Sequence, residues 1–209
     1  MKKPVVIINF KTYKKGKDVL KLARAIEKFD KKIIVGVQPM HLMEVVKKTK
    51  LRVFVQHVDP KDSGRNTGFI IPENVKSDGA KGVFLNHSEH KLNWGILKKT
   101  VKICKKENLK VLIFAGSLKE AKRVKKLKPD YLIYEPPELV AGKISVSKAK
   151  PDLIEKIGKK LKYPFYVGAG IKDRNDLDIA MKFGAKGIAV SSAITKAKNV
   201  KKALKRLLG

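Results

Sequence analysis

Short apolar runs alternate along the chain with segments in which apolar residues recur at helical spacing. The runs read as strands buried on both faces, because they are short and almost uninterrupted. The segments between them carry one apolar face each, as Leu22, Ile26 and Phe29 do in the first. The predicted strands are residues 5–8, 33–37, 53–56, 82–85, 111–114, 131–134, 165–167 and 187–190.

Local signals mark where two of the helices begin or end. Ser117 followed by Glu120 has the spacing of a capping box, which predicts a helix that continues through Leu127. Asp173 is a candidate N-cap for the helix that carries Leu177, and Gly184 is a candidate stop at its C-terminal end.

The alternation of strand and helix over 209 residues predicts one α/β domain, residues 1–209, folded as a (β/α)8 TIM barrel. At about 26 residues for each strand–helix unit, the barrel is compact. The alternative is an open doubly wound sheet, but no G-x-G-x-x-G sequence opens the first helical segment. No stretch has the composition of a linker between domains.

Composition excludes several classes of protein. The longest apolar runs are far shorter than the roughly 20 residues that a membrane span needs. The first residues lack the apolar stretch and cleavage site of a signal peptide. Cys104 is the single cysteine, so the chain cannot form an internal disulfide. We therefore expect a soluble, cytoplasmic protein that does not associate with membranes.

The charge is strongly basic, with 49 Lys and Arg against 19 Asp and Glu, for a formal net charge of +30. Arginine occupies only six of these positions, and lysine is spread over nearly every predicted helix. Proteins that read nucleic acid often interleave arginine with aromatic residues on one patch. We therefore interpret the lysines as solvated helix faces and expect only non-specific nucleic-acid binding. A basic nucleic-acid-associated protein remains an alternative. Under either interpretation of the lysines, the positive electrostatic field of the protein attracts small anions.

Polar and small residues follow several of the predicted strands directly. In a barrel of this kind the chemistry lies at the C-terminal ends of the strands, so these residues converge on one face. A lysine, a histidine and a glutamate there, beside turns that present backbone N–H groups, suit proton transfer on a phosphorylated small molecule. The residues are Asn9, Lys11, His87 and Glu135, with Gly170, Ser191 and Ser192 after the last two strands.

At these positions the chain resembles the triosephosphate isomerase family in its shorter archaeal form. The resemblance rests on motifs that include Asn9-Phe10-Lys11-Thr12-Tyr13, Asn86-His87-Ser88-Glu89 and Tyr134-Glu135-Pro136-Pro137-Glu138-Leu139. Gln56-His57-Val58-Asp59-Pro60, Gly168-Ala169-Gly170-Ile171 and Val146-Ser147-Lys148-Ala149-Lys150-Pro151 match it as well. Each motif alone is weak, but the six occur in family order and cover nearly the whole chain.

The resemblance implies an enzyme of glycolysis and gluconeogenesis that interconverts dihydroxyacetone phosphate and D-glyceraldehyde 3-phosphate through an enediolate. Glu135 would be the general base, and His87 would polarise the carbonyl as a neutral imidazole. We expect a helix that begins near Leu92 to lower the pKa of His87. Lys11 would supply positive charge, held by Glu89.

The resemblance also assigns the binding of the substrate. Asn9 and Lys11 would contact it, and backbone N–H groups at Val140, Gly170, Ser191 and Ser192 would hold its phosphate. No metal or organic cofactor is implied. Three segments depart from the family pattern. The lid reads Leu139-Val140-Ala141-Gly142-Lys143-Ile144, Phe114-Ala115-Gly116 stands where the archaeal form commonly has Cys, and the pair Ser191-Ser192 follows the archaeal pattern only loosely.

The stretch from 60 to 72 is long for a loop between barrel units. In the family the corresponding loop reaches into a second subunit, so we expect a homodimer or homotetramer; the alternative is a lid over the protein's own site. His57 reads as a structural or interfacial residue.

Another sugar-phosphate isomerase or a cyclase on the same barrel is an alternative function, which the Asn9–Lys11 pair disfavours.

Overall fold

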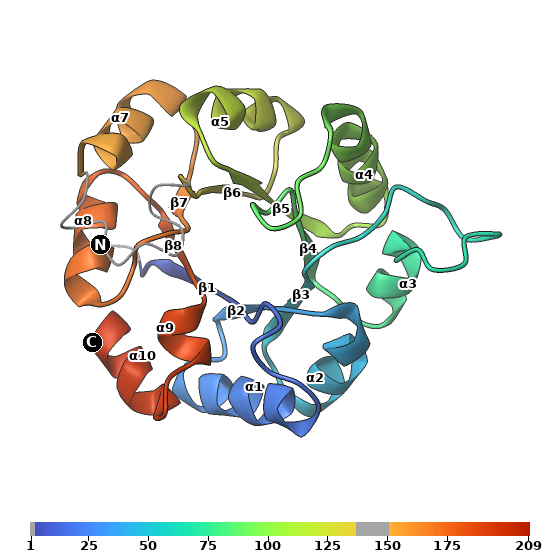
Figure 1. The fold of residues 1–209 in the computed structure, drawn as a ribbon, viewed down its shortest axis with the longest axis horizontal. Helices are drawn as coiled ribbons and strands as arrows, with labels where there is room; N and C mark the ends of the chain where they lie inside the picture. The colour runs from blue at the N-terminus through green and yellow to red at the C-terminus, as the bar shows by residue number, and fades with distance from the viewer. Residues whose placement is uncertain (1–2, 137–150) are drawn as a thin grey trace.

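Eight parallel strands close into a barrel in the computed structural model, which describes residues 3–136 and 151–209 (Figure 1). Each strand pairs with the next in sequence, and β8 pairs with β1 to complete the ring. The strands are β1 (Val5–Asn9), β2 (Ile34–Val37), β3 (Arg52–Val55), β4 (Gly82–Leu85), β5 (Lys110–Ala115), β6 (Tyr131–Tyr134), β7 (Tyr166–Val167) and β8 (Gly187–Val190). The predicted barrel is thus confirmed, and the open doubly wound sheet is wrong.

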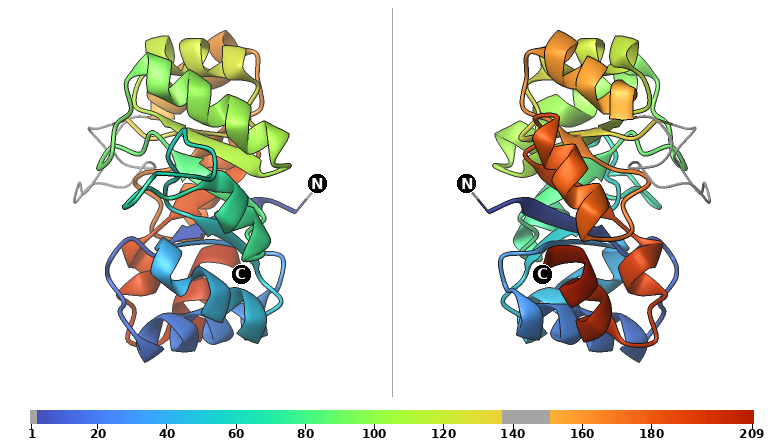
Figure 2. Two further views of the ribbon diagram at one scale, coloured as in Figure 1. Left: turned by 90° about the vertical axis from the view of Figure 1, so that its right-hand side faces the viewer. Right: turned by 90° about the vertical axis from the view of Figure 1, so that its left-hand side faces the viewer.

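The helices form a ring outside the barrel (Figures 1 and 2). The helices that precede β8 lie in the connections from one strand to the next, as parallel strands require, and α9 and α10 follow β8. The helices are α1 (Lys17–Phe29), α2 (Leu42–Lys48), α3 (Pro72–Ser77), α4 (Trp94–Lys106), α5 (Leu118–Val124), α7 (Pro151–Leu161), α8 (Arg174–Lys182), α9 (Ser192–Thr195) and α10 (Val200–Leu208). Two short 3-10 helices, η1 (Pro39–His41) and η2 (Lys125–Leu127), adjoin α2 and α5.

The predicted helix ends are largely those observed. Asp173 Oδ1 accepts a hydrogen bond from the Asp176 N–H at 3.1 Å, and Gly184 ends the helix with a φ of +94°. Ser117 Oγ accepts from the Glu120 N–H at 3.1 Å, but the Glu120 carboxylate accepts from the Gly116 N–H at 2.7 Å. Only half of the capping box is therefore formed, and Glu120 is directed towards the end of the barrel instead.

Two apolar layers hold the barrel together. The outer layer lies between the strands and the helices, and the inner layer fills the barrel itself. Phe84 lies in the inner layer between Phe54 and Phe114, with ring centroids 5.9 Å and 5.7 Å away. These large rings need a small residue opposite, because a Cβ on Gly36 would lie 2.0 Å from the Phe84 ring. The packed interior closes the barrel below the polar residues at its C-terminal end.

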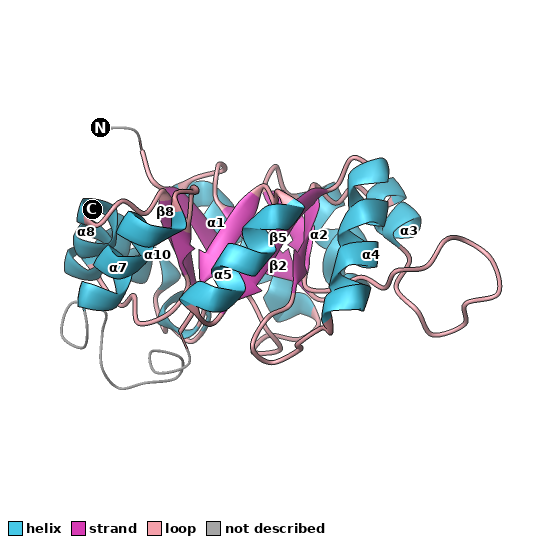
Figure 3. Cartoon of the chain, turned by 90° about the horizontal axis from the view of Figure 1, so that it is seen from above, coloured by secondary structure: helices cyan, strands magenta, loops and turns pink. Residues whose placement is uncertain are grey.

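The segment between β3 and α3 extends outward, beyond the ring of helices (Figures 1 and 3). It carries Phe69, which is 47% exposed. This outward direction is less consistent with the alternative of a lid over the protein's own site than with the expected contact to a second subunit. In the part of the chain that the structure describes, no helix is both long and apolar enough to span a membrane.

Candidate active site

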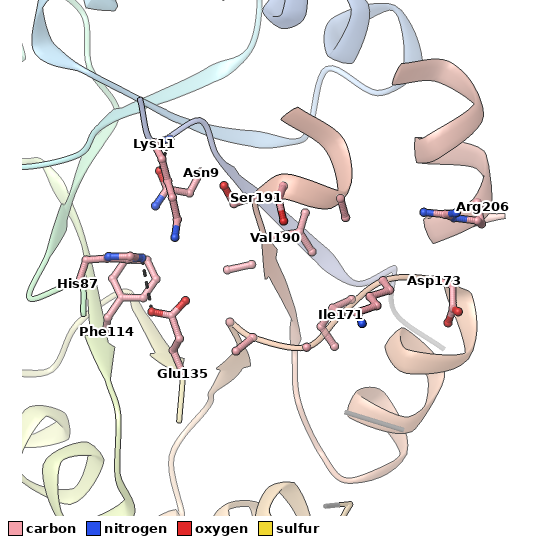
Figure 4. Close-up of a pocket in the computed structure, with 17 residues that line it drawn as sticks. Asn9, Lys11, His87, Phe114, Glu135, Ile171, Asp173, Val190, Ser191 and Arg206 are labelled. Atoms are coloured by element: carbon pink, nitrogen blue, oxygen red, sulfur yellow. Dashed lines mark hydrogen bonds and ion pairs between the residues drawn. The ribbon is translucent and has the colours of Figure 1, made fainter. Parts of the chain in front are cut away.

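A cavity of about 520 Å³ opens at the C-terminal ends of the strands (Figure 4). Seven of the residues that the sequence singled out line it: Asn9, Lys11, His87, Glu135, Gly170, Ser191 and Ser192. Val140 and the lid segment 139–144 lie outside the described residues. The fold therefore brings side chains from the ends of β1, β4, β6, β7 and β8 to one space.

Lys11 occupies a backbone conformation that the surrounding residues hold in place. Its φ is +46°, a left-handed value that costs a non-glycine residue about 1 kcal/mol. Asn9 Oδ1 accepts a hydrogen bond from the Lys11 N–H at 2.9 Å, and Gln56 Nε2 donates to the Lys11 carbonyl at 3.0 Å. Gln56 Nε2 also lies 3.2 Å from Asn9 Oδ1 and 3.1 Å from the Gly36 carbonyl. Strain that is fixed from several sides in this way is typical of functional positions.

The ammonium group of Lys11 is anchored by Glu89, as the sequence predicts. Lys11 Nζ lies 2.5 Å from Glu89 Oε1, across 78 residues of sequence. The side chain of Lys11 is 16% exposed, whereas that of Glu89 is 59% exposed. The pair thus keeps a positive charge at the cavity while the compensating carboxylate faces solvent.

The surroundings of His87 select one neutral tautomer. Its Nδ1 accepts a hydrogen bond from the Glu89 N–H at 3.1 Å, so the proton of a neutral ring lies on Nε2. Nε2 lies 3.4 Å from Glu135 Oε2, on the side of the cavity. The ring is also held edge-on against Phe114, with centroids 4.6 Å apart. His87 can therefore donate one hydrogen bond into the cavity.

Glu135 lies directly after β6 with its side chain only 8% exposed. Ser88 Oγ donates to Glu135 Oε2 at 3.3 Å. A Cβ on Gly168 would lie 2.5 Å from Ile133 Cγ2 and 3.2 Å from the Cβ of Glu135. The glycine after β7 is thus required for the close packing beside the carboxylate.

Burial moves the pKa values of these two groups in opposite directions. It raises the pKa of Glu135 from 4.5 to about 7, against the positive charge of Lys11, which lowers it. Burial lowers the pKa of His87 from 6.5 to about 4, and the charge of Lys11 adds to this effect. Near neutral pH the site therefore holds a carboxylate poised to gain or lose a proton and a histidine without charge.

The cause of the low pKa of His87 differs from the one expected. Helix α4 begins at Trp94 rather than near Leu92, and Asn93 caps it by accepting a hydrogen bond from the Ile96 N–H at 2.9 Å. The N-terminal end of the helix is thus separated from His87 by a turn. Desolvation and the nearby Lys11 carry the effect instead.

The turns to which the resemblance assigns the binding of the phosphate, after β7 and before α9, line the cavity. Gly170 has a φ of +71°, which gives the tight turn after β7 that lines the cavity. Ser191 precedes α9, and its Oγ is buried without a hydrogen-bond partner among the described residues. A buried hydroxyl without a partner loses free energy unless a ligand or water satisfies it, so this side chain is suited to an anion in the cavity.

His57 lies outside the cavity, as expected of a structural or interfacial residue. Its ring stacks on His90 with centroids 4.2 Å apart, and its Nε2 lies 3.3 Å from Asp59 Oδ1. Burial, followed by the charge of a protonated His90, lowers the pKa of His57.

Within residues 3–136 and 151–209, no group of three His, Cys, Asp or Glu side chains has the arrangement of a metal site.

Sequence reasoning missed four residues that shape the site. Gln56 and Ser88 were visible as polar residues just after strands, which is the signal that identified their neighbours. Phe114 was noticed only as a departure from a family pattern, and its contact with His87 depends on the closed barrel. Arg206, which lines the outer part of the cavity from α10, gave no signal because it lies in an ordinary amphipathic helix.

Comparison with known proteins agrees with this geometry. The family model described as triosephosphate isomerase matches residues 4–207. A triosephosphate isomerase of Methanothermus fervidus is 35% identical, over 100% of this chain and 99% of its own. That of Methanocaldococcus jannaschii is 34% identical over 98% of both chains, and that of Saccharolobus solfataricus is 38% identical over 97% of this chain and 93% of its own. With the barrel, the cavity and a match over nearly its whole length, the chain belongs to the triosephosphate isomerase family.

Proposed function

We propose that Glu135, His87 and Lys11 carry the interconversion of dihydroxyacetone phosphate and D-glyceraldehyde 3-phosphate, the reaction of the family to which the chain belongs. The observation that carries this assignment is the pairing of Glu135 with His87 at 3.4 Å in one cavity, with pKa values moved apart. A carboxylate base beside a neutral histidine is well known from triosephosphate isomerases themselves.

Glu135 takes a proton from the carbon next to the substrate carbonyl. The electron pair of that C–H bond becomes the double bond of an enediolate, and the carbonyl oxygen gains negative charge. The hydroxyl proton on the carbon that was deprotonated passes to the former carbonyl oxygen, and the same carboxyl group returns its proton to the former carbonyl carbon. The first carbon then carries the new carbonyl, which completes the exchange of ketone and aldehyde. A single base serves both carbons because the two lie side by side in the planar intermediate.

His87 and Lys11 stabilise the charge that develops on the oxygen atoms. The Nε2–H of His87 donates to the oxyanion, and a neutral imidazole with a pKa of about 4 stays in this donor form over the neutral range. The Lys11 ammonium, held by Glu89, attracts both the enediolate and the phosphate. Asn9 positions Lys11 through the hydrogen bond to its backbone N–H.

The phosphate of the substrate binds the backbone N–H groups of the turns at Gly170, Ser191 and Ser192, and Val140 contributes from outside the described residues. Two turns that present amide groups form an anion site of the kind found at helix N-termini. The Ser191 hydroxyl, buried and lacking a partner in the described chain, supports an anion at this place.

A coupled assay of glyceraldehyde 3-phosphate isomerisation tests the assignment, with Glu135→Gln and Glu107→Gln purified in parallel. We expect the wild type and the Glu107 variant to turn over alike, and Glu135→Gln to lose about 10²- to 10⁴-fold in kcat, the usual contribution of a general base. Binding of a monophosphate inhibitor should remain, because Gln keeps the shape of the cavity. Substantial residual activity in Glu135→Gln would exclude this residue as the base.

We also propose that the chain forms a homodimer or homotetramer through the segment 60–72. This segment extends outward beyond the helices and carries Phe69, with the Lys61 ammonium 4.7 Å from the centre of its ring. Met40 is 79% exposed and Met43 45% exposed, so further apolar surface is open. Light scattering on the wild type and Phe69→Glu gives the test. An oligomer that dissociates in the variant is expected, and a monomeric wild type overturns the proposal.

The triose phosphates are charged metabolites that do not cross membranes unaided, so we place the enzyme in the cytoplasm, where glycolysis and gluconeogenesis supply and consume them. Fractionation of cells with an antibody to the chain checks this location.

A further inference from the structure

The cavity continues past the phosphate-binding turns to helix α10. Lys11, His87 and Glu135 lie at one end, and Arg206 and Asp173 lie at the other (Figure 4). Its volume of about 520 Å³ is in the range of about 300–1,000 Å³ that accommodates drug-sized ligands. A triose phosphate, with three carbons and one phosphoryl group, fills only part of such a space. The described walls therefore leave room beyond the inner phosphate position.

Arg206 brings a positive charge to this outer end. Within the described part of the chain, no carboxylate or carbonyl holds its guanidinium group. Arg174, at the start of α8, is different, because it pairs with Asp178 at 2.8 Å and donates to the Leu208 carbonyl. Asp173 faces the same end of the cavity, but its Oδ1 already accepts the hydrogen bond that caps α8.

The choice of arginine at this position also favours an anion. Of the 49 Lys and Arg residues only six are arginine, and all the others are lysine. A guanidinium presents paired N–H donors that match a phosphoryl group, whereas an ammonium acts as a point charge. A basic residue in the last turn of α10 also interacts favourably with the helix dipole, and Lys205 shares that property. Only Arg206 of the two lines the cavity.

We propose that Arg206 forms an outer anion subsite, and that the cavity binds small molecules with two phosphoryl groups. The first phosphoryl group lies in the turns at Gly170 and Ser191, and the second is bound by the Arg206 guanidinium. The inference rests on the proposed function, since the inner position is the one assigned there to the phosphate of the substrate. Bisphosphorylated ligands of sufficient length are then competitive inhibitors of the isomerase, and a monophosphate of the same length lacks the outer contact.

Calorimetric titration with two matched compounds tests the subsite. Hexyl phosphate and 1,6-hexanediol bisphosphate differ only in the second phosphoryl group. For the wild type we expect the bisphosphate to bind roughly tenfold more tightly, the effect of a charge-assisted hydrogen bond at a partly exposed site. Arg206→Gln should remove this advantage, and Arg206→Lys should keep part of it. Lys205→Gln, which removes a neighbouring charge from the same helix turn, is the control and should retain the full advantage.

Several results would overturn the subsite. The subsite is refuted if the wild type binds the two compounds with equal affinity. It is also refuted if Arg206→Gln and Lys205→Gln lose the affinity advantage of the bisphosphate equally, because the general positive field, rather than a local contact, would then attract the second phosphoryl group. Assays of isomerase activity on the same wild-type sample report on the proposed function separately. An inactive protein that still shows the Arg206-dependent preference would refute the assigned reaction and support the subsite.

Discussion

Replacing the buried carboxylate Glu135 by glutamine should lower kcat about 10²- to 10⁴-fold and, at the same time, stabilise the fold at alkaline pH. The side chain is 8% exposed, and its burial raises its pKa to about 7. An ionised carboxylate in this place is held at a cost in folding free energy, because water is replaced by the walls of the cavity. The glutamine has nearly the same shape and carries no charge.

The magnitude follows from the difference in pKa between the folded and unfolded chain. The folded protein keeps the proton of Glu135 up to about pH 7, whereas the unfolded chain loses it near pH 4.5. Between these values the folded state binds more protons, so the stability of the wild type falls as the pH rises. The difference corresponds to about 3 kcal/mol when the carboxyl is fully ionised. Below the unfolded pKa this cost is absent.

Urea unfolding of the wild type and Glu135→Gln at about pH 5 and about pH 8.5 measures the effect. Because the carboxyl of the unfolded chain is already mostly ionised at pH 5, the variant should gain about 2 to 3 kcal/mol relative to the wild type between the two conditions. His87 titrates in the unfolded chain over the same range in both proteins, so its contribution cancels in the comparison. Glu107→Gln, outside the cavity, controls for the loss of one negative charge from a chain of net charge +30. A difference between wild type and variant that does not change with pH would refute the reasoning.

Four further results are expected. The kcat/KM of the wild type should rise with pH to a plateau with a midpoint near 7, as Glu135 ionises; a midpoint near 6 would instead reflect the phosphate of the substrate. His87→Gln should lower kcat about 10²-fold or more through the loss of the oxyanion donor, and an unchanged steady-state rate would remove His87 from the site. Gln56→Ala should lower kcat/KM about tenfold because Lys11 loses a partner of its strained backbone, and a change in stability alone, with full activity, would contradict this positioning role. Because the net charge is +30 and the substrate is an anion, kcat/KM should fall several-fold with added salt while kcat stays constant; an effect on kcat alone would exclude electrostatic steering.

Much of the fold was available from local sequence signals. The uninterrupted apolar runs located all eight strands to within about a residue or two, since a strand buried on both faces leaves no place for polar side chains. Asp173 and Gly184 marked the ends of α8 because caps act within one helical turn. Glu120 was the exception. Its carboxylate binds Asn86 and Lys91 from another strand–helix unit, contacts that a capping motif does not encode.

The sequence by itself also determined which residues at the strand ends reach the cavity, because chain order and the parallel barrel place every strand end on one face. Lys11, His87 and Glu135 could be found in this way. Their chemical state could not, because the pKa values of His87 and Glu135 depend on burial by walls that come from several strands. Arg206 likewise lines the cavity only because α10 packs against the barrel in the folded chain, and the residue pattern of a helix does not indicate which other elements lie next to it. The tertiary structure decided these properties because desolvation and charge act through space rather than along the chain.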